Sequence, residues 1–249
     1  MPDFEDSTLW RISAYERFRQ ERGTSAFAPL GGNTVLPTTL MADLRHLEAR
    51  REQTDVLEVM AACMRHRQSA LACLRHDGLV WPVTVFPAEM LYHSPRDLCG
   101  SATESLADVQ VIACDPAGVR PPGHWMHERV ARADHYWSLK PLLWALALYG
   151  PRRTLLNEIA GNVAYRVTQP RGERPEAPGA MGAAAEQLRR ESATLRDMAR
   201  WPGLSVERAS RLLNGLYLCT SLMVLRSHPS TGTATGLAER LRNLRRPRG

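Results

Sequence analysis

Lysine, long apolar runs and paired cysteines are nearly absent from the sequence. Lys140 is the only lysine, so arginine supplies almost all of the positive charge, and the formal net charge is +6. The arginine bias is typical of a GC-rich bacterial genome, with selection for guanidinium forks that bind phosphate or carboxylate as the alternative. No apolar run reaches about 18 residues, so the sequence predicts no membrane span.

The cysteine pattern and the N-terminus predict a reduced, cytoplasmic protein. The cysteines are odd in number, widely scattered and without a CxxC pair: Cys63, Cys73, Cys99, Cys114 and Cys219. The acidic start at residues 1–6 lacks the basic and then apolar pattern of a signal peptide. At 249 residues with 44% apolar content, the chain is that of a globular protein with one large domain or two small ones.

Motifs that would name a reaction are also missing. The sequence contains no GxSxG, so His93, Ser94 and Asp97 lack the strained elbow that a serine nucleophile needs. Residues 31–34 lack the lysine and the spacing of a phosphate-binding loop. The sequence therefore disfavours an enzyme and predicts no cofactor.

The most informative stretch is residues 194–225, which has the pattern helix, tight turn, helix and short strand. Trp201-Pro202-Gly203 ends the first helix, because proline cannot continue it and glycine accepts left-handed dihedral angles. Ser205 is expected to cap the second helix. The predicted buried stripe of that helix consists of Ala209, Leu212, Leu213, Leu216 and Leu218. With a strand at residues 223–225, the pattern favours a winged-helix-like unit.

The first half changes from helical to strand periodicity. Helices are predicted at three places, namely residues 7–22, the segment with Leu40, Leu44 and Leu47, and the segment that follows Thr54 as its N-cap. Residues 69–76 and 79–86 then predict a β-hairpin, because Asp77-Gly78 between them favours a type I′ turn. Pro82 predicts that the second strand lies at an edge or carries a bulge.

The middle of the chain predicts further strands and one deeply buried helix. Strands are expected at residues 90–93, 108–114 and 163–167. Residues 138–150 form a helical pattern that is apolar nearly all round, and Pro151 is expected to begin a short helix through Ile159.

Together these patterns predict an α+β fold, with a small antiparallel sheet packed with helices and a C-terminal winged-helix-like domain. The boundary is placed where prolines and glycines alternate with charges. The predicted divisions are an N-terminal arm or helix at 1–29, a mixed domain at 30–168, a linker at 169–180, a winged-helix-like domain at 181–229 and a basic, disordered tail at 230–249.

The second helix of the helix-turn-helix carries the first candidate site. Arg208, Ser210, Arg211 and Asn214 are expected on its solvent face, where such side chains contact base edges and phosphates in DNA-binding proteins. Acidic residues nearby dilute the positive charge, whereas a DNA-binding domain usually has a cleaner basic stripe. The sequence therefore favours a packing or protein-contact module over DNA binding, and the same four residues are the candidate contact in either case.

A polar cluster is the second candidate. His124, His127, Glu128 and His135 supply imidazole and carboxylate groups, and the first two histidines would share a helix face. Their spacing is not that of HExxH. The alternatives are a metal-dependent enzyme that uses this loop and, more simply, a polar loop that packs on the core.

Two segments resemble bacterial PATAN-type signalling adaptors. Residues 138–150 (SLKPLLWALALYG) are similar to one of their helices, and residues 195–225 are similar to the winged-helix segment at the end of many such chains. The resemblance implies a non-enzymatic protein that accompanies two-component systems or small Ras-like GTPases with roadblock proteins. No functional residue can be transferred from it.

The hypothesis from the sequence is a cytoplasmic bacterial regulatory adaptor that acts through protein–protein interaction. A winged-helix transcriptional regulator that binds DNA is the first alternative. The metal-dependent enzyme is the second.

Overall fold

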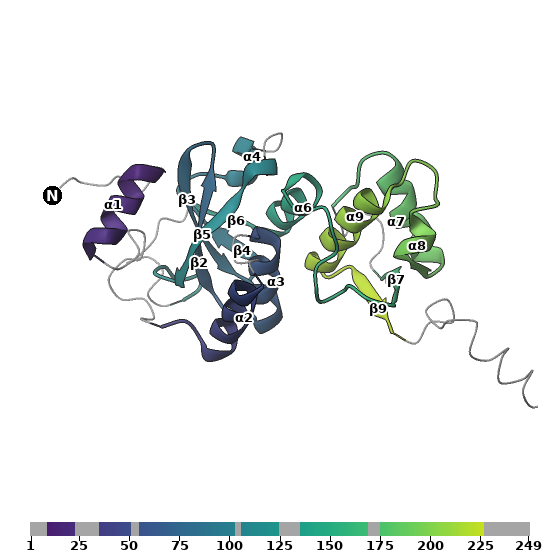
Figure 1. Ribbon diagram of the computed structural model, residues 1–249, viewed down its shortest axis with the longest axis horizontal. Helices are drawn as coiled ribbons and strands as arrows, with labels where there is room; N and C mark the ends of the chain where they lie inside the picture. Colours follow the sequence, from purple (N-terminus) through teal and green to yellow (C-terminus); the bar gives the residue numbers. More distant parts are fainter. Residues whose placement is uncertain are drawn as a thin grey trace, which may run out of the picture.

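The computed structural model describes residues 9–22, 35–50, 55–102, 106–124, 135–168 and 175–226. The protein consists of two antiparallel sheets packed with helices, which lie side by side along the long axis (Figure 1). This arrangement confirms the predicted α+β class. The predicted tail at 230–249 lies outside the described residues.

The first sheet is built around the predicted hairpin. Its strands follow the order β5-β2-β3-β4-β6. Outside this order, β1 pairs with the first two residues of β3. The bounds are β1 Trp10–Arg11, β2 Ala70–His76, β3 Leu79–Phe86, β4 Leu91–His93, β5 Gln110–Pro116 and β6 Tyr136–Ser138. All of these pairs are antiparallel. In the described chain, β5 therefore forms one edge of the sheet.

The hairpin turn has the predicted geometry. Asp77 and Gly78 have φ angles of 50° and 73°, as a type I′ turn requires at both central positions. Every second side chain of the second strand, namely those of Trp81, Val83 and Val85, points into the main core, because successive residues of a strand point to opposite faces.

We expect Gly78→Val to lower the free energy of unfolding by about 1–3 kcal/mol, since a β-branched residue at positive φ is strained. A Cβ at this position would meet no atom within 4 Å, so the effect isolates the backbone conformation. Gly78→Asn is the matched control, because asparagine tolerates this conformation. Equal denaturant midpoints for the two variants would contradict the turn assignment.

The prediction from Pro82 is wrong for the strand as a whole. β3 is a central strand that pairs with β2 over residues 79–85. On its other side, β1 pairs with β3 up to Val80, and β4 pairs with β3 from Thr84 onward. Pro82 lies between these two pairings. The sheet therefore accommodates, inside a central strand, a residue that has no backbone N–H to donate.

Helices cover both faces of the first sheet. On one face lies α1 (Ile12–Arg22), whose Tyr15 packs against Leu71, Cys73 and Val80. The main core lies on the opposite face, beneath α2 (Thr38–Ala49), α3 (Val56–His66) and α6 (Leu139–Tyr149) (Figure 1). The short helices α4 (Leu98–Ala102) and η1 (Leu106–Asp108) precede β5.

The N-cap of α3 differs from the prediction. Asp55, and not Thr54, is the cap: its carboxylate accepts hydrogen bonds from the backbone N–H groups of Leu57 and Glu58. Either residue type can cap a helix. The choice follows from tertiary structure, because the Asp55 carboxylate also pairs with Arg152.

The second unit begins with β7 (Ala164–Val167) and has the strand order β8-β7-β9. Its other elements are α7 (Ala180–Arg190), β8 (Ala193–Thr194), α8 (Leu195–Met198), α9 (Val206–Leu218) and β9 (Leu222–Leu225). The predicted cap of α9 is present, since Ser205 accepts from the N–H of Arg208, and Thr194 forms a capping box with Asp197 at the start of α8.

The short helix predicted after Pro151 is wrong. Residues 151–160 form irregular backbone with one turn, which a side chain from α9 stabilises. Asn214 accepts a hydrogen bond from the N–H of Leu156 at 2.9 Å and donates one to the carbonyl of Thr154 at 2.9 Å. These bonds replace the backbone pairs that a helix would have supplied.

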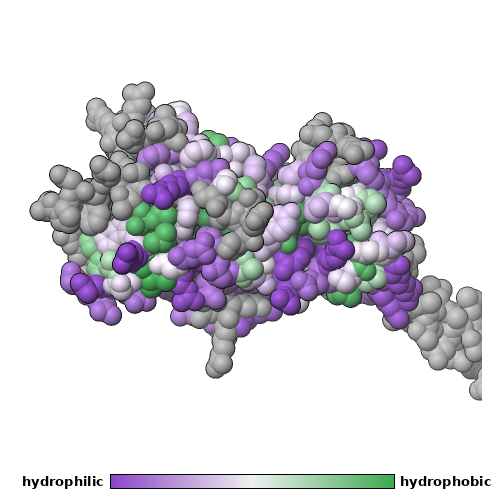
Figure 2. Space-filling view, turned by 90° about the horizontal axis from the view of Figure 1, so that it is seen from above, coloured by the Kyte–Doolittle hydropathy of each residue, from purple (hydrophilic) through white to green (hydrophobic). Residues whose placement is uncertain are grey.

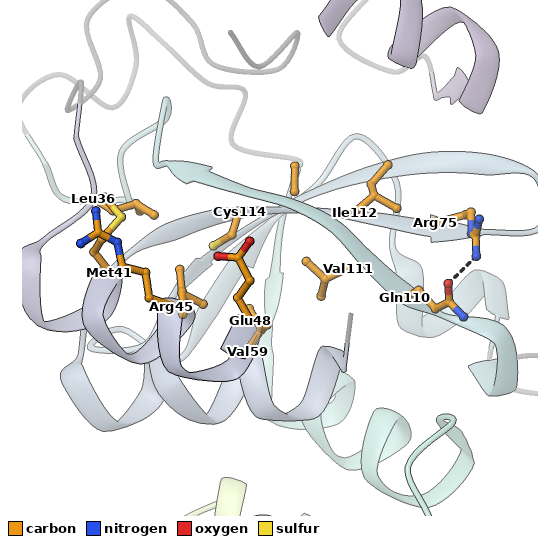
Figure 3. Close-up of a pocket in the computed structure, with 12 residues that line it drawn as sticks. Leu36, Met41, Arg45, Glu48, Val59, Arg75, Gln110, Val111, Ile112 and Cys114 are labelled. Carbon is orange, nitrogen blue, oxygen red and sulfur yellow. Dashed lines mark hydrogen bonds between the residues drawn. The ribbon is translucent and has the colours of Figure 1, made fainter. Parts of the chain in front are cut away.

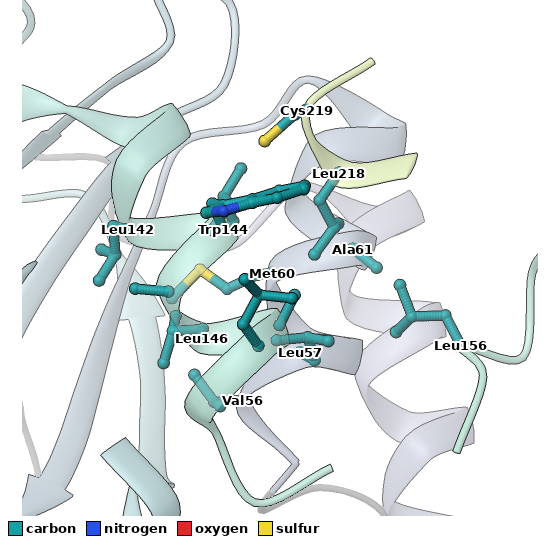
Figure 4. Close-up of a cluster of buried hydrophobic side chains, with 14 of the residues drawn as sticks. Val56, Leu57, Met60, Ala61, Leu142, Trp144, Leu146, Leu156, Leu218 and Cys219 are labelled. Atoms are coloured by element: carbon teal, nitrogen blue, oxygen red, sulfur yellow. The ribbon is translucent and has the colours of Figure 1, made fainter. Parts of the chain in front are cut away.

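One hydrophobic core runs through both units. Figure 4 shows Met60 of α3, Trp144 of α6 and Leu218 of α9 within one cluster. β7 precedes the linker predicted at 169–180 in the sequence, whereas its partner strands β8 and β9 follow that linker. By its pairing, β7 therefore belongs to the second sheet and not to the mixed domain. The domain division stays a prediction, but strand pairing and core packing cross it.

The coloured part of the face in Figure 2 is mainly hydrophilic. In the view of Figure 2, hydrophobic residues gather on the unit that carries the first sheet, among hydrophilic side chains. No helix in the described part of the chain combines the length and the apolar character needed to cross a membrane.

Candidate functional site

The predicted solvent face of α9 is mostly buried. Ser210 is 1% exposed and Asn214 is 0% exposed, so the prediction that they lie on a free surface is wrong. The cause is that α9 packs against α6 and also contacts α7, α8 and β9 of its own unit. A buried helix cannot enter a DNA groove without opening this core.

Arg211 also serves the interior of the protein. Its guanidinium donates to the carbonyl oxygens of Leu148 at 2.7 Å and Gly150 at 2.9 Å, and it pairs with Glu207. These carbonyls belong to the C-terminal end of α6, where helices leave acceptors without partners and favour positive charge. Arg208 alone among the four candidates is exposed, and it donates to the carbonyl of Gly203.

The polar cluster is only partly described. His127 and Glu128 lie outside the described residues, whereas His124 is half-buried and His135 is buried. The ring of His135 lies 5.8 Å from that of His93, measured between centroids. The structure therefore leaves the proposed grouping of His124, His127, Glu128 and His135 as a prediction.

The trio near His93 does not form a nucleophile with an aligned base. Asp97 accepts hydrogen bonds from the hydroxyl of Tyr92 and the N–H of Cys99, which occupy one of its oxygens. The hydroxyl oxygen of Ser94 is buried, and no described residue forms a hydrogen bond with it. A serine nucleophile requires a hydrogen-bonded base, so this segment lacks the geometry for that chemistry.

An open groove of about 620 Å³ lies between α2 and β5. Figure 3 shows Met41, Arg45 and Glu48 of α2 on one side, Val111 and Cys114 of β5 on the other, and Val59 of α3 beneath. Periodicity explains this placement, because residues three and four apart on α2 share a face. The remaining lining residues are Leu36, Leu44, Arg75, Gln110, Ile112 and Ala113.

The backbone of β5 forms one wall of the groove. Within the described chain, β5 pairs only with β2, so its outer side keeps backbone N–H and C=O groups without a strand partner. The register shifts between Cys73 and Leu74 of β2, which marks a bulge in the pairing with β5. Bulges bend the strand that carries the extra residue and occur frequently at sheet edges.

The chemistry of the groove suits recognition. Arg75 donates a hydrogen bond to Gln110 at one end, while Arg45 and Glu48 are exposed on α2. Burial raises the pKa of the Cys114 thiol well above its ordinary value, with carboxylate and thiol neighbours adding to the effect, so the reactive thiolate is disfavoured. The described lining contains no imidazole or hydroxyl group.

A buried charge network joins α3 to the turns that precede β7. Arg152 pairs with Asp55 at 2.6 Å and with Glu58 at 2.8 Å. Glu58 is 2% exposed and also accepts from the N–H and the amide nitrogen of Asn157. Each charge therefore has partners, and this network supports the structure.

Comparisons with protein-family models, curated proteins and solved structures found no match. The groove and the buried network were both missed from the sequence. Their residues come from segments far apart in the chain, and an unpaired strand edge leaves no local pattern.

Proposed function

We propose that the protein is a regulatory adaptor that binds an extended segment of another protein along β5. The observation that carries this proposal is the outer side of β5, which has no strand partner in the described chain, beside an open, largely apolar groove. An extended segment that adds to a sheet edge gains backbone hydrogen bonds, while pockets for alternate side chains supply specificity.

The groove defines the chemistry of the segment. Apolar side chains would contact Met41, Leu44 and Val111, which line one continuous surface. Arg45 and Arg75 lie among the lining residues and favour an acidic residue in the segment. The occupant is therefore an extended peptide with alternating apolar residues and a carboxylate.

The C-terminal unit is proposed to be winged-helix-like and to serve as a packing module. Its order of β7, α7, β8, α8, α9 and β9 supports this interpretation. The face of α9 that a DNA-binding regulator would need carries the buried Ser210 and Asn214, so no observation favours the DNA-binding alternative.

The resemblance to PATAN-type adaptors supplies the first partners to test. A small Ras-like GTPase with its roadblock protein and a response regulator of a two-component system are the candidates. A cytoplasmic location fits such partners and belongs to the same proposal.

A displayed library of random linear peptides tests the binding mode before any natural partner is identified. We expect the protein to select peptides with alternating apolar residues. Met41→Lys and Leu44→Lys should weaken their binding by about tenfold or more, because each places a charge in the groove. The measurement is the dissociation constant of a selected peptide for each variant.

Ala42→Lys is the matched control, since Ala42 is an exposed residue of the same helix outside the groove lining. This variant should bind as the unchanged protein does. Failure to select any peptide, or equal effects of Met41→Lys and Ala42→Lys, would contradict the proposed function.

A further inference from the structure

The end of the β2–β3 hairpin brings one imidazole and two carboxylates together. His76 ends β2, Asp77 occupies the turn and Asp108 ends η1. One ligand atom from each residue lies within 4.8 Å of the other two. The side chain of His76 is 1% exposed, whereas those of Asp77 and Asp108 are 62% and 59% exposed. A buried nitrogen therefore adjoins carboxylates that solvent can reach.

Asp108 orients the imidazole ring. Nδ1 of His76 lies 2.8 Å from Oδ1 of Asp108. An ionised carboxylate can only accept a hydrogen bond, so Nδ1 carries the proton, and in the neutral ring Nε2 keeps its lone pair. Metal-binding histidines are held in the same way, with the second ring N–H donated to a carboxylate.

Nε2 of His76 is buried and has no hydrogen-bond partner among the residues that the structure describes. Oδ2 of Asp77 lies 3.3 Å from it, but the contact does not meet hydrogen-bond geometry. A proton on Nε2 would therefore not point at Oδ2. Without a proton, the lone pair of Nε2 has that same direction, so it points past Oδ2, as it does when a nitrogen and an oxygen bind one ion between them.

The 3.3 Å separation fits two ligands of one ion. Zinc bonds to nitrogen and oxygen are about 2.0–2.2 Å long, so two ligands at right angles or at the tetrahedral angle lie about 2.9–3.5 Å apart. We propose that Nε2 of His76 and the carboxylate of Asp77 bind a divalent transition-metal ion, with Asp108 as the positioning residue and water as the remaining ligands. An imidazole with a carboxylate suits zinc and its neighbours, whereas magnesium and calcium prefer oxygen ligands alone.

Titration of the whole protein with Zn²⁺ alone tests this site, and no partner is needed. We expect saturable binding by calorimetry that Asp77→Asn removes. This variant keeps the turn, because Asn-Gly is a preferred type I′ pair. Asp108→Asn should weaken the same binding by about 10–100-fold, since a neutral amide oxygen replaces the charged acceptor that holds the imidazole. Mg²⁺ and Ca²⁺ should not compete.

Glu89→Gln is the matched control, because Glu89 is an exposed carboxylate in the turn between β3 and β4. It should leave Zn²⁺ binding unchanged, and the melting temperature of each apo variant should match that of the unchanged protein. Zn²⁺ binding that Asp77→Asn leaves intact, or no saturable binding at all, would overturn the proposal and reduce the cluster to surface carboxylates around a buried histidine.

Discussion

Arg152→Ala is expected to lower the free energy of unfolding by about 3–5 kcal/mol, because it removes the cation that pairs with the buried Glu58 and the half-buried Asp55. The guanidinium contacts Asp55 and Glu58 and also donates to the carbonyls of Thr154 and Leu155. Glu58 would lose its cationic partner in a site where it is 2% exposed. Equilibrium denaturation of the purified variant measures the change.

The neighbouring arginine supplies the control. The side chain of Arg153 is 74% exposed, and its contact with Glu207 spans 3.8 Å, so Arg153→Ala should change stability little. Adding Glu58→Gln to Arg152→Ala should restore part of the loss, because the uncompensated charge is then removed. Equal effects of the two arginine variants would contradict a buried ionic network.

Trp144→Ala is expected to lower the free energy of unfolding by about 3–5 kcal/mol and to weaken both units together. The ring is 7% exposed, and its Nε1 donates to the carbonyl of Glu176 at 3.1 Å. It packs so closely on α9 that a Cβ at Gly215 would lie 2.7 Å from the ring. Hydrogen exchange in β3 and in β7 measures the two units separately, and both should become faster.

Tyr149→Ala is the control, because this aromatic residue lies at the end of the same helix and is 44% exposed. Its effect should be small. Faster exchange in β7 alone would mean that the two units fold independently, as the division at residues 169–180 predicts.

Local patterns predicted the secondary structure where chemistry acts over short distances. Asp77-Gly78 determines the hairpin turn, and Ser205 caps α9 as expected. The helix after Pro151 failed because α9 supplies the hydrogen bonds of that segment through Asn214. Such a contact between residues about sixty positions apart leaves no trace in local periodicity.

The face of α9 shows why the candidate site was misplaced. Helical periodicity assigned polar Ser210 and Asn214 to solvent, but both are buried, and Asn214 is hydrogen-bonded there through both its oxygen and its nitrogen. A buried polar side chain with partners is compatible with a core, and sequence alone does not reveal those partners. The groove was missed for the same reason, because α2 and β5 meet only in the folded chain.

Hydrogen exchange with and without a selected peptide tests partner binding at β5 most directly. We expect the peptide to slow exchange of the backbone amides in residues 110–116, because their outer N–H groups gain strand partners. The protection should be lost in Met41→Lys and retained in Ala42→Lys. Protection confined to other elements, with β5 unchanged in a saturated complex, would contradict binding along this strand.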